Sequence, residues 1–289
     1  MKWRNNQTNC WLFFLFFGGL YLDGTGQIPA KDWVKLFNGK NLDGWNVKIH
    51  HHNYGVNFGN TFRVKGKKIV VAYDQYGEFN DQFGHLYYHK PYSHYRLKLE
   101  YRFRGSLQPG APDYTLLNSG VMFHSQDPAT MLKEQDWPIS VEMQFLAGLG
   151  DGKPRPTGNM CSPGTDIVYQ GKKYPGHCLN SASDTYNKDK WVVAELEVLG
   201  DSLVRHIIEG KVVLEYSMPS MGGGVANRYD PAIWEPGKPL NSGFIALQSE
   251  GQPIEFRRIQ LVNLKGCKDS RAKNYQSYLE AHDATTCIY

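Results

Sequence analysis

The sequence lacks any concentration of charge of one sign. Its 289 residues include 32 lysines and arginines and 28 aspartates and glutamates, which leaves a formal net charge of only +4. Proteins that bind nucleic acid usually carry a concentrated basic face, so we expect no nucleic-acid partner. The chain also lacks a Gly-x-Gly-x-x-Gly fingerprint, which argues against an oxidoreductase that binds a dinucleotide.

Long hydrophobic runs are missing apart from one near the N-terminus. Lys2 and Arg4 precede the apolar run Cys10–Leu22, and small residues follow as far as Gly26. This order is typical of a secretory signal peptide, and the run is short for a helix that spans a membrane. We therefore expect residues 1–26 to be removed and the mature protein to be periplasmic or secreted, with no membrane span. An uncleaved anchor is the alternative.

Cysteine is scarce, with five in the chain, and Cys10 falls in the signal segment. The even number that remains in an exported chain predicts two disulfides, for which three pairings are possible. We favour the local pairs Cys161–Cys178 and Cys267–Cys287, each worth roughly 3 kcal/mol in the chain-entropy model. Free thiols are the alternative, and a zinc site is disfavoured because no Cys-x-x-Cys spacing occurs.

Convincing amphipathic helices are missing from the main body, whereas strand signals recur. Aromatic residues make up 13% of the chain, and 30 glycines and 15 prolines supply turns, a mixture that favours an all-β protein of two antiparallel sheets packed face to face. The predicted strands are Tyr95–Arg104, Ser140–Phe145, Trp191–Leu199, the hairpin Leu203–Tyr216 with its turn at Glu209-Gly210, and Gly243–Glu250. The predicted surface loops are Pro109–Pro112, Gly148–Gly164 and Met221–Pro239.

The alternation of polar and apolar residues also predicts a working face. One face of each sheet is expected to be buried, and the other face of one sheet to be unusually polar. The side chains expected to point the same way on that face are Glu100, Arg102, His124, Glu142, Gln144, Gln248 and Glu250. Acids, amides and a guanidinium gathered on one face would suit a binding or catalytic site.

The character of the chain changes close to its C-terminus. Residues 266–289 are bracketed by the last two cysteines and resemble short repeats that end or link exported bacterial proteins. We therefore expect one sandwich domain over residues 27–265, followed by a small disulfide-bracketed appendage.

Several segments, in matching order, resemble the 3-keto-disaccharide hydrolase family. They are Leu36–Trp45 with its Leu-Phe-Asn-Gly-x-x-Leu-x-Gly-Trp pattern, Tyr95–Arg104, Asn118–His124, Val141–Gln144, Lys190–Trp191, Gly243–Gly251 and Phe256–Ile259. The resemblance implies a concanavalin A-like jelly-roll sandwich that acts on glycosides carrying a ketone at sugar carbon 3. The sequence departs from the family pattern where His124 replaces a common arginine and Ser249-Glu250 replaces a common Asp-His pair.

A ketone at carbon 3 acidifies the hydrogen on carbon 2, so a base can form an enolate that expels the glycosidic oxygen from carbon 1. Glu142 or His124 would be the base, and Arg102 or a divalent metal ion would stabilise the enolate oxygen. Glu250 would serve as the acid or as a metal ligand. Water can then add back, which gives net hydrolysis. Glu142 and Arg102 could instead form a cross-strand ion pair on a solvated sheet face.

Other residues are candidates for substrate binding. Gln144 and Gln248 would contact sugar hydroxyls, and Asp166 would border the cleft from the disulfide-bracketed loop. Trp137 and Trp191 could stack on sugar rings, although such residues more often belong to a core, Trp191 especially.

Histidines cluster twice along the chain. The run His50–His52 invites a metal-binding interpretation, but adjacent histidines on an exposed loop are more often solvated. His85, His89 and His94 lie close together along a predicted strand and turn, and a role for them in the site is a further hypothesis.

Two other functions remain open at this stage. Sandwiches of this type also serve as non-catalytic carbohydrate-binding modules, and Glu142 with Glu250 could form a conventional two-carboxylate glycosidase. If the 3-keto reaction holds, a glycoside is the substrate. A separate sugar 3-oxidoreductase must then make the ketone, because this chain lacks a dinucleotide site.

Overall fold

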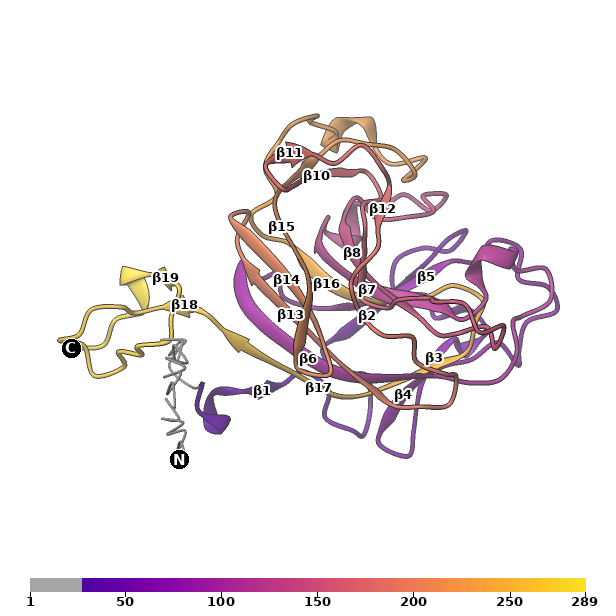
Figure 1. The fold of residues 1–289 in the computed structure, drawn as a ribbon, viewed down its shortest axis with the longest axis horizontal. Helices are drawn as coiled ribbons and strands as arrows, with labels where there is room; N and C mark the ends of the chain where they lie inside the picture. Colours follow the sequence, from indigo (N-terminus) through magenta and orange to yellow (C-terminus); the bar gives the residue numbers. More distant parts are fainter. Residues whose placement is uncertain (1–27) are drawn as a thin grey trace, which may run out of the picture.

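Two large β-sheets stacked face to face make up the body of the protein (Figure 1). The computed structural model describes residues 28–289, so the predicted signal peptide and Cys10 lie outside the described part of the chain. Both large sheets are antiparallel, which confirms the predicted all-β jelly-roll sandwich. No helix among the described residues is long and apolar enough to cross a membrane.

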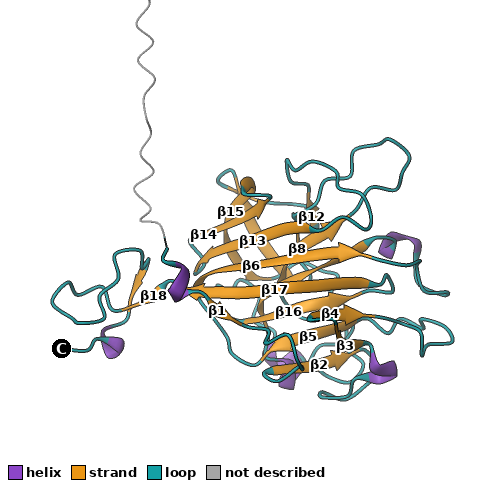
Figure 2. Cartoon of the chain, turned by 90° about the horizontal axis from the view of Figure 1, so that it is seen from below, coloured by secondary structure: helices purple, strands orange, loops and turns teal. Residues whose placement is uncertain are grey.

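The first sheet has ten strands, and several of them lie side by side across the middle of Figure 2. In order of pairing they are β11 (Lys172–Lys173), β10 (Thr165–Tyr169), β15 (Lys211–Met221), β14 (Leu203–Ile208), β13 (Val192–Leu199), β6 (His94–Phe103), β17 (Ile254–Asn263), β4 (Lys68–Val71) and β3 (Phe62–Lys65), with β1 (Val34–Lys35) paired to β17.

The second sheet has seven strands and carries the site described below. In order of pairing they are β12 (Cys178–Leu179), β9 (Asn159–Cys161), β8 (Val141–Leu146), β7 (Asn118–Ser125), β16 (Phe244–Ser249), β5 (Gly84–Tyr88) and β2 (Trp45–Ile49). Short 3₁₀ turns lie before, between and after the strands, at η1 (Ala30–Asp32), η2 (Phe58–Asn60), η3 (Asp113–Thr115), η4 (Pro128–Thr130), η5 (Pro231–Ile233) and η6 (Ala284–Thr286).

The core lies between the two sheets because each strand turns its alternate apolar residues inward. In β6, Leu97 and Tyr101 are almost fully buried, and the Tyr101 ring stacks on Phe145 of β8 with 4.0 Å between centroids. This contact joins the two sheets directly. Burial of such side chains stabilises the fold by about 1.5–3 kcal/mol each.

Two local predictions meet different outcomes. The hairpin between β14 and β15 is confirmed, and Glu209 and Gly210 have φ values of 49° and 78°, as a two-residue primed turn requires. The prediction that Gly148–Gly164 is all surface loop was wrong, because residues 159–161 form β9 and add a buried strand to the seven-stranded sheet. The strand has only three residues inside a run rich in glycine and proline, so its alternation is too short to predict a strand.

Both favoured disulfides are present. Cys161 and Cys178 face each other across β9 and β12, and Cys267 pairs with Cys287. The second disulfide holds the appendage, which projects away from the sandwich in Figures 1 and 2. The appendage has its own small parallel sheet of β18 (Lys265–Gly266) and β19 (Ala281–His282).

Candidate active site

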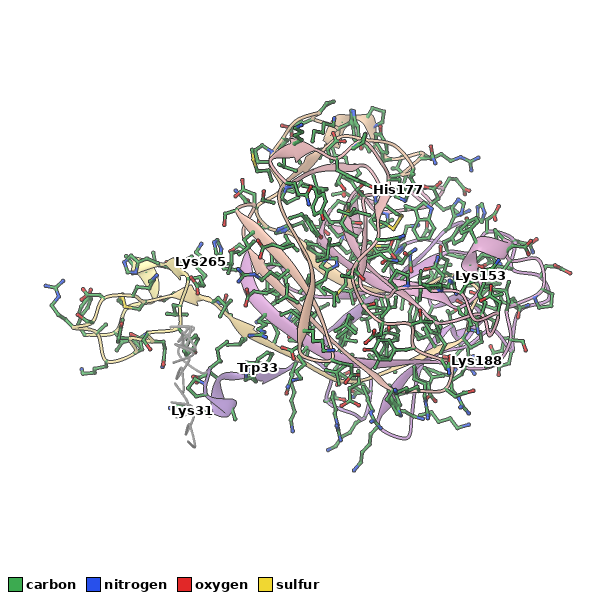
Figure 3. The ribbon with its side chains drawn as sticks, in the orientation of Figure 1. Lys31, Trp33, Lys153, His177, Lys188 and Lys265 are labelled. Carbon is green, nitrogen blue, oxygen red and sulfur yellow. A yellow bond between two sulfur atoms is a disulfide. The ribbon has the colours of Figure 1, made fainter. Side chains whose placement is uncertain are left out.

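A pocket of about 370 Å³ opens on the seven-stranded sheet, on the face turned away from the core. Its volume lies within the range of small-molecule sites, about 300–1,000 Å³. Its lining includes Tyr114, Trp137, Arg155 and His177 from the loops around the sheet. Figure 3 labels His177, which lies at the wall that also contains the Cys161–Cys178 disulfide.

β8 supplies the central carboxyl of the pocket. Glu142 and Gln144 line the pocket, while Met143 between them points into the core, as alternation in a strand requires. Gly120 on β7 lies against this carboxyl, and a Cβ atom at Gly120 would collide with Glu142 Oε1. The absence of a side chain at Gly120 therefore makes the space that the carboxyl occupies.

Glu250 brings a second carboxyl to the same pocket, directly after β16. Burial raises the pKa of Glu142 to about 8, and the Gln248 side chain beside it opposes that shift. Burial also raises the pKa of Glu250 well above its usual range. The Glu142 charge raises that pKa further, and the Arg155 charge lowers it. The pair therefore keeps at least one proton at neutral pH.

Arg155 supplies a fixed positive charge at the pocket. Its guanidinium donates hydrogen bonds to the carbonyl oxygens of Ala147 at 2.7 Å, Leu116 at 2.8 Å and Leu117 at 3.4 Å. Three backbone acceptors fix the orientation of the side chain without neutralising it. The cation can therefore stabilise negative charge that develops in the pocket.

Several buried acceptor atoms around the pocket find no hydrogen-bond partner among the described residues. These atoms are Glu142 Oε1, Glu250 Oε2, Gln248 Oε1 and Asn118 Oδ1. Buried polar atoms are normally paired, so their convergence indicates a ligand that donates hydrogen bonds. Sugar hydroxyls have that property, and the Tyr114 and Trp137 rings add apolar surface to the same pocket.

The structure brings together part of the predicted set. Glu142, Gln144, Glu250 and Trp137 line the pocket. Gln248 is buried on the same face, next to Glu142. These residues come from the loop before β8, from β8 and from the end of β16, two strands that flank β7 in one sheet.

The prediction that Arg102 and Glu100 share this face was wrong. Both belong to β6 of the ten-stranded sheet, where Arg102 pairs with Glu255 at 2.6 Å and Glu100 pairs with Arg257 at 2.6 Å. The two arginines also lie over the Trp191 ring, at 4.5 and 3.9 Å from its centroid. These residues form a charged ladder on the opposite outer face of the sandwich, with the core between them and the pocket.

His124 does not line the pocket either, which corrects its placement on the working face. It has a φ of 45° at an irregular pairing between β7 and β16, and its Nε2 contacts the Gly200 carbonyl oxygen at 2.9 Å. Burial lowers the pKa of His124 to about 4. The irregular backbone turns this residue out of the alternation that the sequence pattern assumed.

Asp166 faces a different hollow. It pairs with Lys173 at 2.8 Å, and both residues line a pocket on the β10 and β15 side that also includes Trp234. Its expected place at the border of the cleft was therefore wrong. The disulfide-bracketed loop does reach the cleft, but through Cys161 and His177.

The three histidines considered as a group are separated. His85 lies on β5 opposite Gln248 and packs against Trp137, and burial lowers its pKa to about 3. His89 contacts the Gly44 carbonyl oxygen, and His94 lines another hollow near Gly200. Only His85 therefore lies near the pocket, behind the Trp137 ring.

Metal-ligating side chains converge at two places in the described chain, neither of which includes Glu142 or Glu250. One comprises Cys161, His177 and Cys178 at the pocket wall, where the disulfide leaves no thiolate for a metal. The second comprises His50, His51 and Glu134, at the end of β2 and in the loop before β8. The pocket therefore gathers two carboxyls rather than a closed set of metal ligands.

Sequence reasoning missed Arg155, Tyr114 and His177. Arg155 lies in a segment that was assigned to a loop, and no local pattern marks an arginine that binds the distant carbonyls of Leu116 and Leu117. Asn118 belongs to the family-like segment Asn118–His124, but only the fold shows that its Oδ1 atom is buried without a partner among the described residues. The Asn118-Ser-Gly motif did contain a usable signal, since Gly120 makes room for the catalytic candidate.

Comparison with solved structures finds distant similarities. A candidate glycosyl hydrolase from Parabacteroides distasonis ATCC 8503 is 21% identical, with a TM-score of 0.48 over 80% of this chain and 98% of that chain. A second candidate glycosyl hydrolase from the same organism is 17% identical, with a TM-score of 0.48 over 81% and 94%. The carbohydrate-binding module CBM66 from Bacillus subtilis is 10% identical, with a TM-score of 0.45 over 76% and 96%.

No curated protein matches the sequence. A family model does match, over residues 32–262, which is most of the described chain. The match agrees with the resemblance carried by the Leu36–Trp45 pattern and the strands that follow it. The chain therefore belongs to the family of 3-keto-α-glucoside-1,2-lyase-like domains, and its function is carbohydrate-related.

Proposed function

We propose that this protein cleaves the glycosidic bond of 3-keto-glycosides by removing the proton on carbon 2 and eliminating the group on carbon 1. The observation that carries the proposal is the pair of buried carboxyls, Glu142 and Glu250, in one pocket with the fixed cation Arg155. Two carboxyls with raised pKa values can supply a base and an acid together. The family supports the substrate class.

Glu142 is the base in this scheme. Its ionised carboxylate takes the proton from carbon 2, and the electrons of that C–H bond form an enolate with the negative charge on the carbon 3 oxygen. Arg155 is the positive group of the pocket that can stabilise this charge, in the role first assigned to Arg102.

Glu250 is the acid. The enolate electrons return to form a double bond between carbons 1 and 2, the bond from carbon 1 to the glycosidic oxygen breaks, and that oxygen takes the Glu250 proton. The sugar product is an unsaturated ketone. Addition of water across its double bond converts the elimination into a net hydrolysis. Gln144, Gln248 and Asn118 would hold the hydroxyl groups of the sugar.

The test compares two matched pairs of variants on a 3-keto-glycoside, with product analysis by mass spectrometry. Glu142→Gln and Arg155→Gln change the pocket, whereas Glu100→Gln and Arg102→Gln change the opposite outer face. We expect the first pair to lose kcat by about 100-fold or more and the second pair to stay near the wild type. Full activity of Glu142→Gln would contradict the proposal.

A conventional glycosidase is the second candidate, because Glu142 and Glu250 line the same pocket. The same assay run on the plain glycoside separates the two reactions. Cleavage of the plain sugar would favour the conventional enzyme, and cleavage of the oxidised sugar alone would favour elimination. Tight binding of either sugar without turnover would instead identify a carbohydrate-binding module.

The proposed reaction also has a requirement outside this chain. Its substrate already carries a ketone at carbon 3, so an enzyme that oxidises the carbon 3 hydroxyl must act first. We propose that this oxidation is done by a separate oxidoreductase, and that both act on glycosides outside the cytoplasm if the N-terminal segment directs export.

A further inference from the structure

We propose that His50, His51 and Glu134 form a binding site for a divalent transition-metal ion of the zinc class, separate from the pocket. Ligand atoms of these three side chains lie within 4.8 Å of one another. His50 and His51 directly follow β2, whereas Glu134 lies in the loop before β8, about 80 residues later in the chain. The fold, and not the local sequence, therefore assembles the set.

The imidazole of His50 is prepared as a ligand. Its Nδ1 lies 2.8 Å from the Asp81 carbonyl oxygen, which requires Nδ1 to be the donor. The neutral ring then presents a lone pair at Nε2, and this buried atom has no hydrogen-bond partner among the described residues. Metal-binding histidines typically make such a bond through the nitrogen that does not touch the metal.

The backbone fixes both histidines. The His50 N–H donates to the Phe83 carbonyl oxygen at 2.8 Å, and the His51 N–H donates to the Lys133 carbonyl oxygen at 3.0 Å. The two rings stack with 3.7 Å between centroids. His51 Nδ1 lies 2.6 Å from Glu134 Oε2, so the carboxylate already meets the cluster.

His52 is excluded from the cluster although it is adjacent in sequence. Its Nε2 lies 2.8 Å from Gln82 Oε1, and its ring stacks on Phe58 at 4.3 Å. The run of three histidines is therefore divided into a pair that faces Glu134 and a third residue that packs elsewhere. This division supplies a control variant from within the same run.

The donor set selects the class of metal. Two imidazole nitrogens with one carboxylate suit Zn²⁺, Cu²⁺ or Ni²⁺, whereas Mg²⁺ and Ca²⁺ prefer oxygen ligands. Lys48 donates to the Lys133 carbonyl oxygen close by, and Lys133 Nζ lies 4.0 Å from Glu134 Oε1. The two lysine ammonium groups repel a metal ion that is held by charge alone. The site therefore favours a metal that forms strong bonds to imidazole.

A metal bound here would tie the end of β2 to the loop that leads into the pocket. Glu134 precedes Trp137 by three residues, and Trp137 lines the pocket. We therefore expect zinc to stabilise this loop. The site itself is tested by binding, so its outcome does not depend on the proposed reaction.

The experiment titrates the mature chain with Zn²⁺ against a chromophoric chelator, and repeats the titration with His51→Ala, Glu134→Gln and His52→Ala. His51 and Glu134 have partly exposed side chains, so we expect these variants to fold, as circular dichroism will check. The expected result is one Zn²⁺ per wild-type chain and about 10-fold or greater weakening in the first two variants only.

Substitution by Co²⁺ gives a second readout, because a four-coordinate site produces intense visible absorption bands. These bands should appear in the wild type and in His52→Ala, and should be lost in His51→Ala. Absence of zinc binding, equal binding in all variants, or equal weakening by His52→Ala would each overturn the assignment.

Discussion

The Glu142 carboxyl is buried, with one oxygen that lacks a hydrogen-bond partner among the described residues. Such a group destabilises a folded protein unless a ligand completes it. Glu250 meets the same condition a short distance away in the pocket. At the scale of single residues, the main sign of function is this pair of buried carboxyls, each with an oxygen that lacks a hydrogen-bond partner among the described residues.

The pH dependence of the rate follows from this pair. In the proposed reaction Glu142 must be ionised to act as the base, and burial raises its pKa to about 8, so kcat/KM should rise with pH through about pH 8. The ionised Glu142 raises the pKa of Glu250 further, so Glu250 should keep its proton after Glu142 has lost its own, and the rate should fall once Glu250 also ionises. Steady-state kinetics on a 3-keto-glycoside from about pH 5 to about pH 10 check this profile. A flat profile would contradict the assigned roles.

Gly120→Ala tests the space around the same carboxyl. The added Cβ would collide with Glu142 Oε1, so the carboxyl must move. We expect a loss of activity of about 10-fold or more and a destabilisation of about 1–3 kcal/mol. Gly77→Ala is the control, because a Cβ at Gly77 meets no atom within 4 Å. Equal activities of the two variants would show that the close approach is unimportant.

At the scale of elements, the site depends on which strands are neighbours. β8 pairs with β7 on one side and β9 on the other, and β16 pairs with β7. This order brings Glu142 together with Glu250, although about 100 residues separate them in the sequence. The short strands β12, at the edge of the sheet, and β9 beside it then form one wall, held by a disulfide.

Removal of that disulfide should affect both stability and activity. In the Cys161→Ser/Cys178→Ser variant, we expect a loss of about 3 kcal/mol in the free energy of unfolding and a lower kcat/KM, because both residues line the pocket. The matched control is Cys267→Ser/Cys287→Ser, whose disulfide belongs to the appendage. Urea denaturation and steady-state kinetics measure both effects. Equal losses of activity in the two double variants would contradict this account.

At the scale of the whole molecule, the two outer faces of the sandwich have different chemistry. The ten-stranded sheet presents paired charges, such as Arg102 with Glu255, whereas the seven-stranded sheet presents buried acids without such partners. The shared core keeps the faces apart. The appendage contributes none of the residues that line the pocket.

Burial of the Glu142 carboxyl should lower the free energy of unfolding at high pH, where the carboxyl is ionised. A carboxyl whose pKa is raised on folding contributes full stability below its unfolded pKa, near 4.5, and loses it as the pH rises toward about 8. Glu142→Gln should therefore be more stable than the wild type at high pH, by up to about 4 kcal/mol, with a much smaller difference in acid. Urea denaturation at both pH extremes measures this. Glu280→Gln, at an exposed position, should show no such gain.

The amino-acid sequence determined the local features: the strands, the Glu209-Gly210 turn, the nearby cysteine pairs and the residues that share a face within one strand. It also identified Glu142, Gln144 and Glu250 through alternation and the family pattern. Local steric preferences and side-chain periodicity suffice for these features.

Only the tertiary structure decided which strands share a sheet, and so whether two polar faces coincide. Alternation has a period of two in every strand, and it is the same for Arg102 on one outer face as for Glu142 on the other. The positions of Arg155 and of the His50, His51 and Glu134 cluster were likewise set by contacts between distant segments. Such contacts depend on how the sheets pair and pack, a long-range property that no local pattern contains.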